Sequence, residues 1–195
     1  VIVNSNKIKA INFYKIFKKK IEELKKKIIN YHNHNIGLSR LQKINYFIDN
    51  FKKLNKFKFK KRLLLKRFSS YCINDISKCK EIPGALKFLK LLNKQAFEII
   101  LCSATPTKEL KQILANRKID NKFDKISGFP NKKTEFISNL ILKKGISKNS
   151  IVYFGDSNSD YLAAKNNNID FIYVNSNENF TYKNKKIITI NDFIL

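Results

Sequence analysis

The chain has 195 residues, 43% of them hydrophobic, and its 40 Lys and Arg against 15 Asp and Glu give a net charge of +25. This length and hydrophobic content suffice for a buried core with an inserted lid. No apolar run is long enough to cross a bilayer and no signal-peptide pattern is seen, so we expect neither a membrane protein nor a secreted one. Cys72, Cys79 and Cys102 are an odd number without metal-binding spacing, which favours a reducing cytoplasm.

The positive charge has two interpretations. It could mark a protein that binds nucleic acid or an anionic surface, or it could reflect a compositional drift towards Lys, Asn and Ile. The basic residues occur in every segment, without a Gly/Arg-rich tail or a single dense block, and Asn is also abundant. We therefore favour drift and do not expect a nucleic-acid partner, although the charge would still attract a phosphorylated substrate.

The first part of the chain, residues 6–78, is predicted to be all-helical. Apolar residues recur at steps of three and four from Ile11 to Ile28, as in one amphipathic helix. A polar break with both histidines follows over 30–37, and Ser39 with Gln42 forms a capping-box pattern that begins the next helix.

A third, basic helix is expected over about 58–76, and the pattern changes at 82–84, which read Ile-Pro-Gly. Beyond this point helices alternate with short apolar runs, which is typical of βαβ units and a parallel sheet. The expected elements are helix 86–92, strand 97–102, a helix from Thr105 or Pro106, strand 125–128, helix 134–144, strand 151–154, helix 158–167, strand 171–174 and strand 186–190.

A buried strand, a glycine and two acids lie together over residues 151–160. The apolar run before Gly155 is typical of a strand buried on both faces, and we expect the glycine to permit a sharp turn. Asp156 then lies at the carboxyl end of the strand, and Asp160, in the first turn of the next helix, leans back towards it. Two carboxylates aimed at one point favour a hard cation such as Mg²⁺, but a helix N-cap with a first-turn acid explains them equally well.

Two further residues also lie at the carboxyl end of a strand or at the start of the next helix. Ser103 ends the strand before the helix at 105 or 106, so its hydroxyl lies beside free amides that can bind an anion, or simply caps the helix. Lys133 stands near the start of a helix, where a cation opposes the helix dipole. Together with Asp156 and Asp160 they supply a hydroxyl and an ammonium for phosphate and two acids for a metal, which is the equipment for phosphoryl transfer.

The sequence resembles the haloacid dehalogenase-type phosphatases, in particular the phosphoglycolate phosphatase-like branch with a helical cap, over nearly the whole chain. Residues 101–106 (Leu-Cys-Ser-Ala-Thr-Pro) resemble the family's second motif, 128–133 (Gly-Phe-Pro-Asn-Lys-Lys) the third and 155–160 (Gly-Asp-Ser-Asn-Ser-Asp) the fourth. The resemblance implies a three-layer Rossmann-like α/β core over 1–5 and 79–195, with a helical cap inserted over 6–78.

The resemblance also implies roles for single residues. Ser103 and Ala104 would lie at the transferred phosphoryl group, Lys133 would neutralise phosphate and nucleophile as a catalytic residue, and Asp156 and Asp160 would hold Mg²⁺. A cap segment that faces the active site in relatives is similar to 34–40, which makes Arg40 a candidate for binding the distal group of the substrate. A solvated arginine in the first turn of a helix is the alternative for this residue.

One motif of the family has no counterpart in the chain. Relatives carry an Asp-x-Asp pair at the end of their first strand, followed by a glycine and a run like Val1–Ser5. The sequence contains no such pair and no Met. We therefore expect an N-terminally incomplete chain that lacks the nucleophile, the general acid/base and the central strand between those that carry Ser103 and Asp156.

The sequence thus predicts a Mg²⁺-dependent phosphomonoester hydrolase of small phosphorylated metabolites, which acts through an aspartyl-phosphate and is inactive in the form given. Three alternatives stay open: a non-catalytic relative that binds a partner or an anion, a sugar-phosphate mutase of the same fold, and, less favoured, a basic nucleic-acid binder. The substrate and the oligomeric state are left open.

Overall fold

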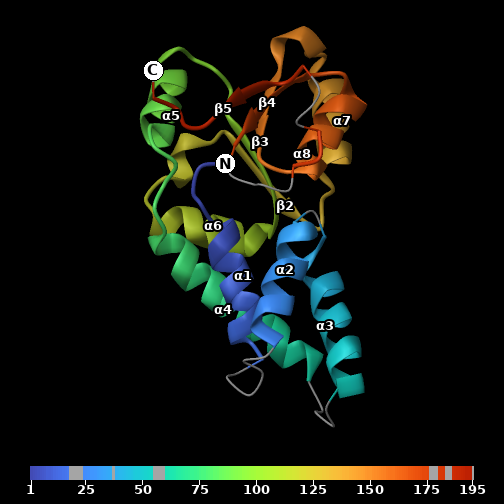
Figure 1. The fold of residues 1–195 in the computed structure, drawn as a ribbon. Helices are drawn as coiled ribbons and strands as arrows, with labels where there is room; N and C mark the ends of the chain where they lie inside the picture. The colour runs from blue at the N-terminus through green and yellow to red at the C-terminus, as the bar shows by residue number, and fades with distance from the viewer. Residues whose placement is uncertain (18–23, 37, 55–59, 176–179, 183–185, 195) are drawn as a thin grey trace. The chain divides into compact units, whose positions relative to one another are not determined.

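The structure is a computed structural model that describes residues 1–17, 24–36, 38–54, 60–175, 180–182 and 186–194. The chain divides into two compact units (Figure 1): Val1–Asn4 together with Lys80–Leu195, and Ser5–Cys79. Among the residues that the structure describes, no helix combines the length and the apolar character needed to cross a membrane.

The unit Ser5–Cys79 is helical. Its α-helices in the described residues are α1 (Asn6–Lys15), α2 (Lys25–His34), α3 (Arg40–Leu54) and α4 (Lys61–Lys78). An aromatic core joins them around Phe13, which is 2% exposed and whose ring centroid lies 4.1 Å from that of Phe68 and 5.8 Å from that of Phe47. The burial of these large apolar rings stabilises the packing of the helices against one another.

The single helix expected from Ile11 to Ile28 is wrong, because this region forms two helices, α1 and α2. The buried face is confirmed in part, since Phe17, Leu24 and Ile28 are 4%, 7% and 0% exposed. In α1 it differs, because Ala10 and Phe13 are 2% exposed whereas Ile11 is 43% exposed. Both faces fit a helical period, and contacts with the other helices of the unit decide which face is buried. The sequence pattern does not contain that information.

The polar break expected over 30–37 begins too early, because α2 continues to His34. His32 lies inside the helix, 3% exposed, with its ring centroid 5.2 Å from that of Phe13. The capping box before α3 is confirmed, because the amide of Ser39 donates to Oε1 of Gln42 at 2.9 Å and the amide of Gln42 donates to Oγ of Ser39 at 3.3 Å. Gly37 and the first residues of the expected helix 58–76 lie outside the described residues.

The other unit alternates strands and helices. Its elements are α5 (Ala85–Lys94), β1 (Ile100–Pro106), α6 (Thr107–Asn116), β2 (Lys125–Phe129), α7 (Lys133–Lys144), β3 (Val152–Gly155), α8 (Asn158–Asn167), β4 (Asp170–Val174) and β5 (Ile188–Ile190), with short 3₁₀ turns at Asp120–Lys122 and Lys148–Ser150. All strand pairs are parallel. The α/β class with a parallel sheet is therefore confirmed.

The described strands form two sheets, with the orders β1-β2 and β3-β4-β5. Ile2 packs against the apolar clusters of both, since it contacts the cluster that includes Leu101 of β1 and the cluster that includes Phe154 of β3. The amide of Ile82 donates to the carbonyl of Ile2 at 2.9 Å, which fixes this first segment in the unit. No described strand pairs with both β1 and β3.

One boundary near the site differs from the expectation. β1 extends to Pro106, which pairs with Phe129, and α6 begins only at Thr107. A residue that precedes proline is pushed towards extended backbone, so Thr105 favours the strand over the helix. Ser103 therefore lies in the middle of β1, where the register shifts between Cys102 and Pro106, and not at a helix start.

Candidate active site

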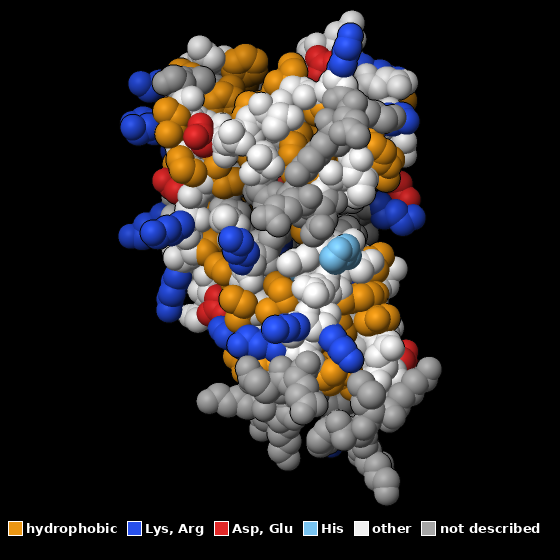
Figure 2. Space-filling view, viewed as in Figure 1, with side chains coloured by type: hydrophobic (Ala, Val, Ile, Leu, Met, Phe, Trp, Pro, Cys, Tyr) orange, Lys and Arg blue, Asp and Glu red, His pale blue; other side chains and the backbone are white. Residues whose placement is uncertain are grey.

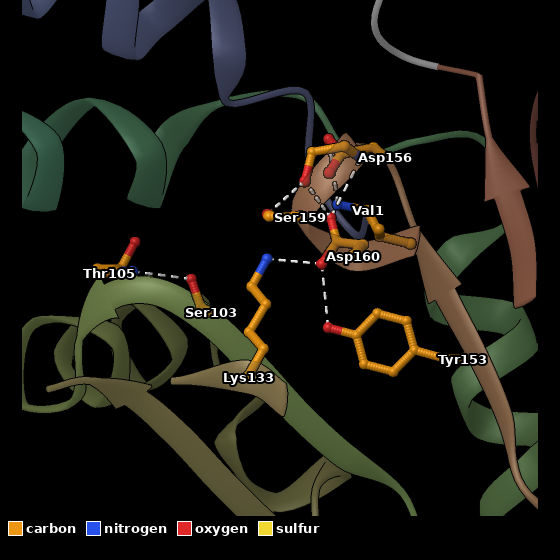
Figure 3. A network of polar contacts seen from close by, with 9 residues as sticks. Val1, Ser103, Thr105, Lys133, Tyr153, Asp156, Ser159 and Asp160 are labelled. Carbon is orange, nitrogen blue, oxygen red and sulfur yellow. Dashed lines mark hydrogen bonds and ion pairs between the residues drawn. The ribbon is translucent and has the colours of Figure 1, made fainter. Parts of the chain in front are cut away.

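The side chains of Ser103, Lys133, Asp156 and Asp160 come from elements that meet at one edge of the α/β unit. Lys133 is the first residue of α7, Asp156 follows β3 directly, and Asp160 lies in the first turn of α8. Figure 3 shows the Lys133 side chain reaching towards Asp160, with Ser103 and Thr105 on its other side. Carboxyl ends of parallel strands and helix N-termini are where open α/β folds bind their ligands.

Asp160 is 4% exposed, and four hydrogen bonds hold its carboxylate. Oδ2 accepts from the amide of Ser157 at 3.1 Å and from its hydroxyl at 2.6 Å, within the capping box of α8. Oδ1 accepts from Nζ of Lys133 at 2.6 Å and from the hydroxyl of Tyr153 at 3.0 Å. The helix therefore has a cap with Asp160 as its first-turn acid, but Ser157 and not Asp156 is the N-cap residue. The same contacts fix the acid that pairs with the lysine.

The ion pair between Lys133 and Asp160 is shielded from water, with side chains 18% and 6% exposed. Burial acts to lower the pKa of Lys133, but the charge of Asp160 and the hydrogen bond to it prevail, so this pKa is raised above its usual value. The lysine is a fixed cation at neutral pH. A cation at the first position of α7 is unfavourable for the helix dipole, and its buried partner compensates for this.

Gly155 has a different role from the turn that the sequence suggested, because its backbone is not among the glycines with positive φ. A Cβ placed on it would lie 2.3 Å from Cβ of Asp160 and 2.8 Å from Cε2 of Phe171. Only glycine leaves room for the Asp160 side chain at this point.

Tyr153 is the site residue that the sequence reasoning missed. It lies in β3, and its hydroxyl donates to Asp160 as described above. Burial, followed by the nearby charge of Asp160, raises the pKa of Tyr153 well above its usual value, so the phenol stays protonated. A signal did exist, because a tyrosine in an otherwise apolar strand needs a hydrogen-bond partner when it is buried.

Asp156 lies at the same edge, with a 19% exposed side chain and Oδ2 4.0 Å from the nitrogen of Val1. Within the described part of the chain no three His, Cys, Asp or Glu side chains form a metal-binding group. Mg²⁺ commonly takes one or two protein carboxylates together with water and substrate phosphate. Asp156 fits such a site, whereas Asp160 already uses both carboxylate oxygens in hydrogen bonds.

Ser103 has its hydroxyl oxygen fixed by the amide of Thr105, which donates to Oγ at 3.1 Å. A hydroxyl that accepts in this way can still donate its hydrogen to an anion. Ala104, between these two residues, is exposed. Burial raises the pKa of the neighbouring Cys102 to about 11, so the thiol is protonated and unreactive at neutral pH.

Arg40 is the first residue of α3 in the helical unit. Its Nη1 donates to Oγ of Ser69 at 2.9 Å, and its guanidinium carbon lies 5.1 Å from the ring centroid of Phe68. These contacts orient the guanidinium.

The positive charge is not shared evenly between the units. Residues 5–79 contain 21 Lys and Arg against 4 Asp and Glu, and the remaining residues contain 19 against 11. On the face drawn in Figure 2, the basic side chains stand at separate places among hydrophobic and uncharged polar ones. This face therefore does not show the continuous basic surface that a nucleic-acid binder would present.

The comparisons with known proteins agree with this arrangement. The family model described as haloacid dehalogenase-like hydrolase matches residues 1–174, so the chain belongs to the haloacid dehalogenase-like hydrolases. A search of curated proteins found no match. This membership places the chain among hydrolases.

Solved structures show the same fold at low sequence identity. A predicted phosphoglycolate phosphatase from Haemophilus somnus is 19% identical, with a TM-score of 0.79 over 98% of this chain and 90% of that one. A predicted phosphatase from Clostridium acetobutylicum is 17% identical, with a TM-score of 0.68 over 96% and 88%. YfnB from Bacillus subtilis, in a structure described as bound to magnesium, is 15% identical, with a TM-score of 0.73 over 98% and 90%.

Proposed function

We propose that this protein is a Mg²⁺-dependent phosphomonoester hydrolase of small phosphorylated metabolites, similar to phosphoglycolate phosphatases. The observation that carries the proposal is the buried ion pair between Lys133 and Asp160, 2.6 Å long, at the edge where Ser103 and Asp156 also lie. Family membership and the phosphatase names of structural neighbours support it.

Charge neutralisation is the task of the proposed phosphate site. The Ser103 hydroxyl donates to one phosphoryl oxygen, and the Lys133 ammonium binds another while it keeps its contact with Asp160. Because a phosphoryl group in transfer carries negative charge on its outer oxygens, fixed donors at these positions stabilise the transition state.

Asp156 is the carboxylate that we assign to the metal. When bound, Mg²⁺ would neutralise phosphate charge and orient the substrate. The four hydrogen bonds on Asp160 support a role in which this acid holds Lys133 beside the metal site.

An attacking carboxylate for the aspartyl-phosphate step is not apparent in the chain, since the sequence has no Asp-x-Asp pair. The nitrogen of Val1 lies 4.0 Å from Oδ2 of Asp156, so residues joined ahead of Val1 would enter the site. We therefore propose a comparison between the 195-residue chain and the same chain preceded by Asp-Ser-Asp-Gly.

Hydrolysis of p-nitrophenyl phosphate with Mg²⁺ tests the proposal. We expect the extended chain to be active, and Asp156→Ala and Lys133→Ala to lower its rate at least a hundredfold. Inactivity of the well-folded extended chain on p-nitrophenyl phosphate and on a panel of phosphometabolites would contradict the function. An ordinary rate from the 195 residues alone, abolished by Asp156→Ala, would instead contradict only the account of the nucleophile.

The helical unit is the proposed source of substrate choice. We propose that 6–78 form a cap on the core 1–5 and 79–195, and that Arg40 binds the distal group of the substrate. Arg40→Lys keeps the charge but loses the planar donor pair, so it should raise KM for a preferred carboxylated or bisphosphorylated substrate more than it lowers kcat. The three cysteines form no disulfide in the described structure, which accords with the proposed cytoplasmic location.

A further inference from the structure

We propose that Tyr153 is a positioning residue for Lys133 and acts through Asp160. The inference rests on the proposed function, because it concerns the lysine assigned to phosphate. The phenol hydroxyl occupies one of the lone-pair positions of the Asp160 carboxylate. This leaves the ammonium of Lys133 able to bind a phosphoryl oxygen.

The geometry starts from Oδ1 of Asp160, which accepts from Lys133 at 2.6 Å and from Tyr153 at 3.0 Å. A carboxylate oxygen offers about two lone-pair positions. With the hydroxyl of Tyr153 on one of them, Lys133 is limited to the other. Oδ2 offers no alternative, because both of its contacts come from Ser157.

The surroundings hold the phenol in this position. Tyr153 packs against the apolar cluster of α7 and α8, and its ring stacks with that of Phe171 at a centroid distance of 6.4 Å. A Cβ placed on Gly155 would lie 2.8 Å from Cε2 of Phe171 and 2.9 Å from Cγ of Asp160, so the Phe171 ring and the Asp160 side chain border the same small space. The hydroxyl cannot be moved away from Asp160 without disturbing this packing.

The consequence concerns the lysine. An ammonium has three N–H donors, and Lys133 directs one of them at Oδ1. Without the phenol hydroxyl, Asp160 would present a free lone pair and a less neutralised charge, which would draw the ammonium further onto the carboxylate. A phosphoryl oxygen would then compete less well for Lys133.

The test measures the binding of inorganic phosphate to the 195-residue chain by isothermal titration calorimetry. Tyr153→Phe should weaken phosphate binding about fivefold, as expected for the loss of one hydrogen bond that acts on the ligand through a neighbour. Tyr161→Phe is the matched control, because Tyr161 also packs its ring against Phe171 and should bind phosphate as the wild type does. Replacement of Tyr153 by p-aminophenylalanine keeps a donor in place and should restore binding.

The outcomes separate this inference from the proposed function. If Lys133→Ala removes phosphate binding while Tyr153→Phe leaves it unchanged, the phosphate site stands and the role of Tyr153 is refuted. If the wild type binds no phosphate, the proposed function loses its support, and crystal structures of wild type and Tyr153→Phe decide the positioning role. Unchanged positions of Nζ of Lys133 and the carboxylate of Asp160 in the variant would overturn it.

Discussion

The ammonium of Lys43 lies 3.1 Å from Nδ1 of His32 in the interior of the helical unit, where the two residues are 2% and 3% exposed. No carboxylate is among the charged groups that shift the pKa of either residue, and Lys9 adds a further positive charge. Burial lowers the pKa of Lys43 to about 7, and burial with the charges of Lys43 and Lys9 lowers the pKa of His32 to about 3. Both residues therefore lose their proton more readily than in water, and the interior tolerates the pair because their neutral forms cost less to bury.

This relationship predicts how stability depends on pH. Between the folded pKa of Lys43, about 7, and its unfolded value, 10.5, the unfolded chain binds a proton that the folded chain does not. Stability therefore rises with pH across this window, and His32 adds a rise between about 3 and 6.5. Lys43→Met should stabilise the helical unit by about 2 kcal/mol at pH 7 and remove the rise above pH 7. Urea unfolding followed by circular dichroism at pH 7 and pH 10 measures both effects.

Lys66→Met is the control for this prediction, since Lys66 is an exposed lysine of α4. Its stability should follow the wild type at both pH values, within about 0.5 kcal/mol. A Lys43→Met variant that keeps the wild-type pH dependence would show that Lys43 titrates normally in the folded protein.

The buried face of α1 gives a second prediction. Phe13→Ala should destabilise the protein by about 3–5 kcal/mol, because it removes a ring that packs against Phe47, Phe68 and His32. Ile11→Ala, two residues away and 43% exposed in the wild type, should cost under about 1 kcal/mol. Chemical unfolding of the two variants measures the difference. A larger loss of stability in Ile11→Ala than in Phe13→Ala would show that Ile11 lies on the buried face, as the sequence pattern predicts.

The α/β unit was predictable because its signals are local. The short apolar runs 151–154 and 171–174, and the helix 158–167 between them, fix the order of strands and helices, and the structure has α8 at Asn158–Asn167. The helical unit was predicted less well, because the choice between the Phe13 and Ile11 faces depends on contacts with residues far along the chain. A period of 3.6 residues identifies a helix but not its partner.

The candidate site also has some features that the sequence predicts and others that depend on tertiary packing. The placement of Lys133 at the start of α7 and of Asp160 in the first turn of α8 followed from the pattern of strands and helices, whereas Ser103 lies inside β1 and not at its end. The roles of Gly155 and Tyr153 did not, since both depend on where the Asp160 side chain lies in three dimensions. Steric fit and shared hydrogen bonds of this kind are set by tertiary packing, and a single sequence does not display them.

The third prediction concerns the lack of room for a side chain at Gly155. Gly155→Ala should destabilise the protein by about 2 kcal/mol or more, because the added Cβ would lie 2.3 Å from Cβ of Asp160 and displace that side chain. Gly145→Ala is the matched control, since a Cβ there meets no atom within 4 Å and only its φ of +61° opposes alanine. We expect about 1 kcal/mol for the control. Equal losses in thermal unfolding would show that the site tolerates movement of Asp160.

The last prediction compares two neighbouring lysines. Lys133 pairs with the buried Asp160, whereas Lys132 pairs with Glu135 at 2.8 Å, and the side chains of the second pair are 78% and 63% exposed. Asp160→Asn leaves the ammonium of Lys133 without its counter-charge in a dry site, which should cost about 3–5 kcal/mol. Glu135→Gln should cost under about 0.5 kcal/mol, because an exposed pair is screened by water.

Guanidinium unfolding of Asp160→Asn and Glu135→Gln measures the comparison, and the double variant Lys133→Met/Asp160→Asn completes it. The double variant should recover part of the loss, because it removes the uncompensated charge along with its partner. A single Asp160→Asn variant as stable as Glu135→Gln would mean that water reaches Lys133. In that case the carboxylate would not be the group that fixes the lysine, and Asp160 would serve the helix cap through its two hydrogen bonds with Ser157.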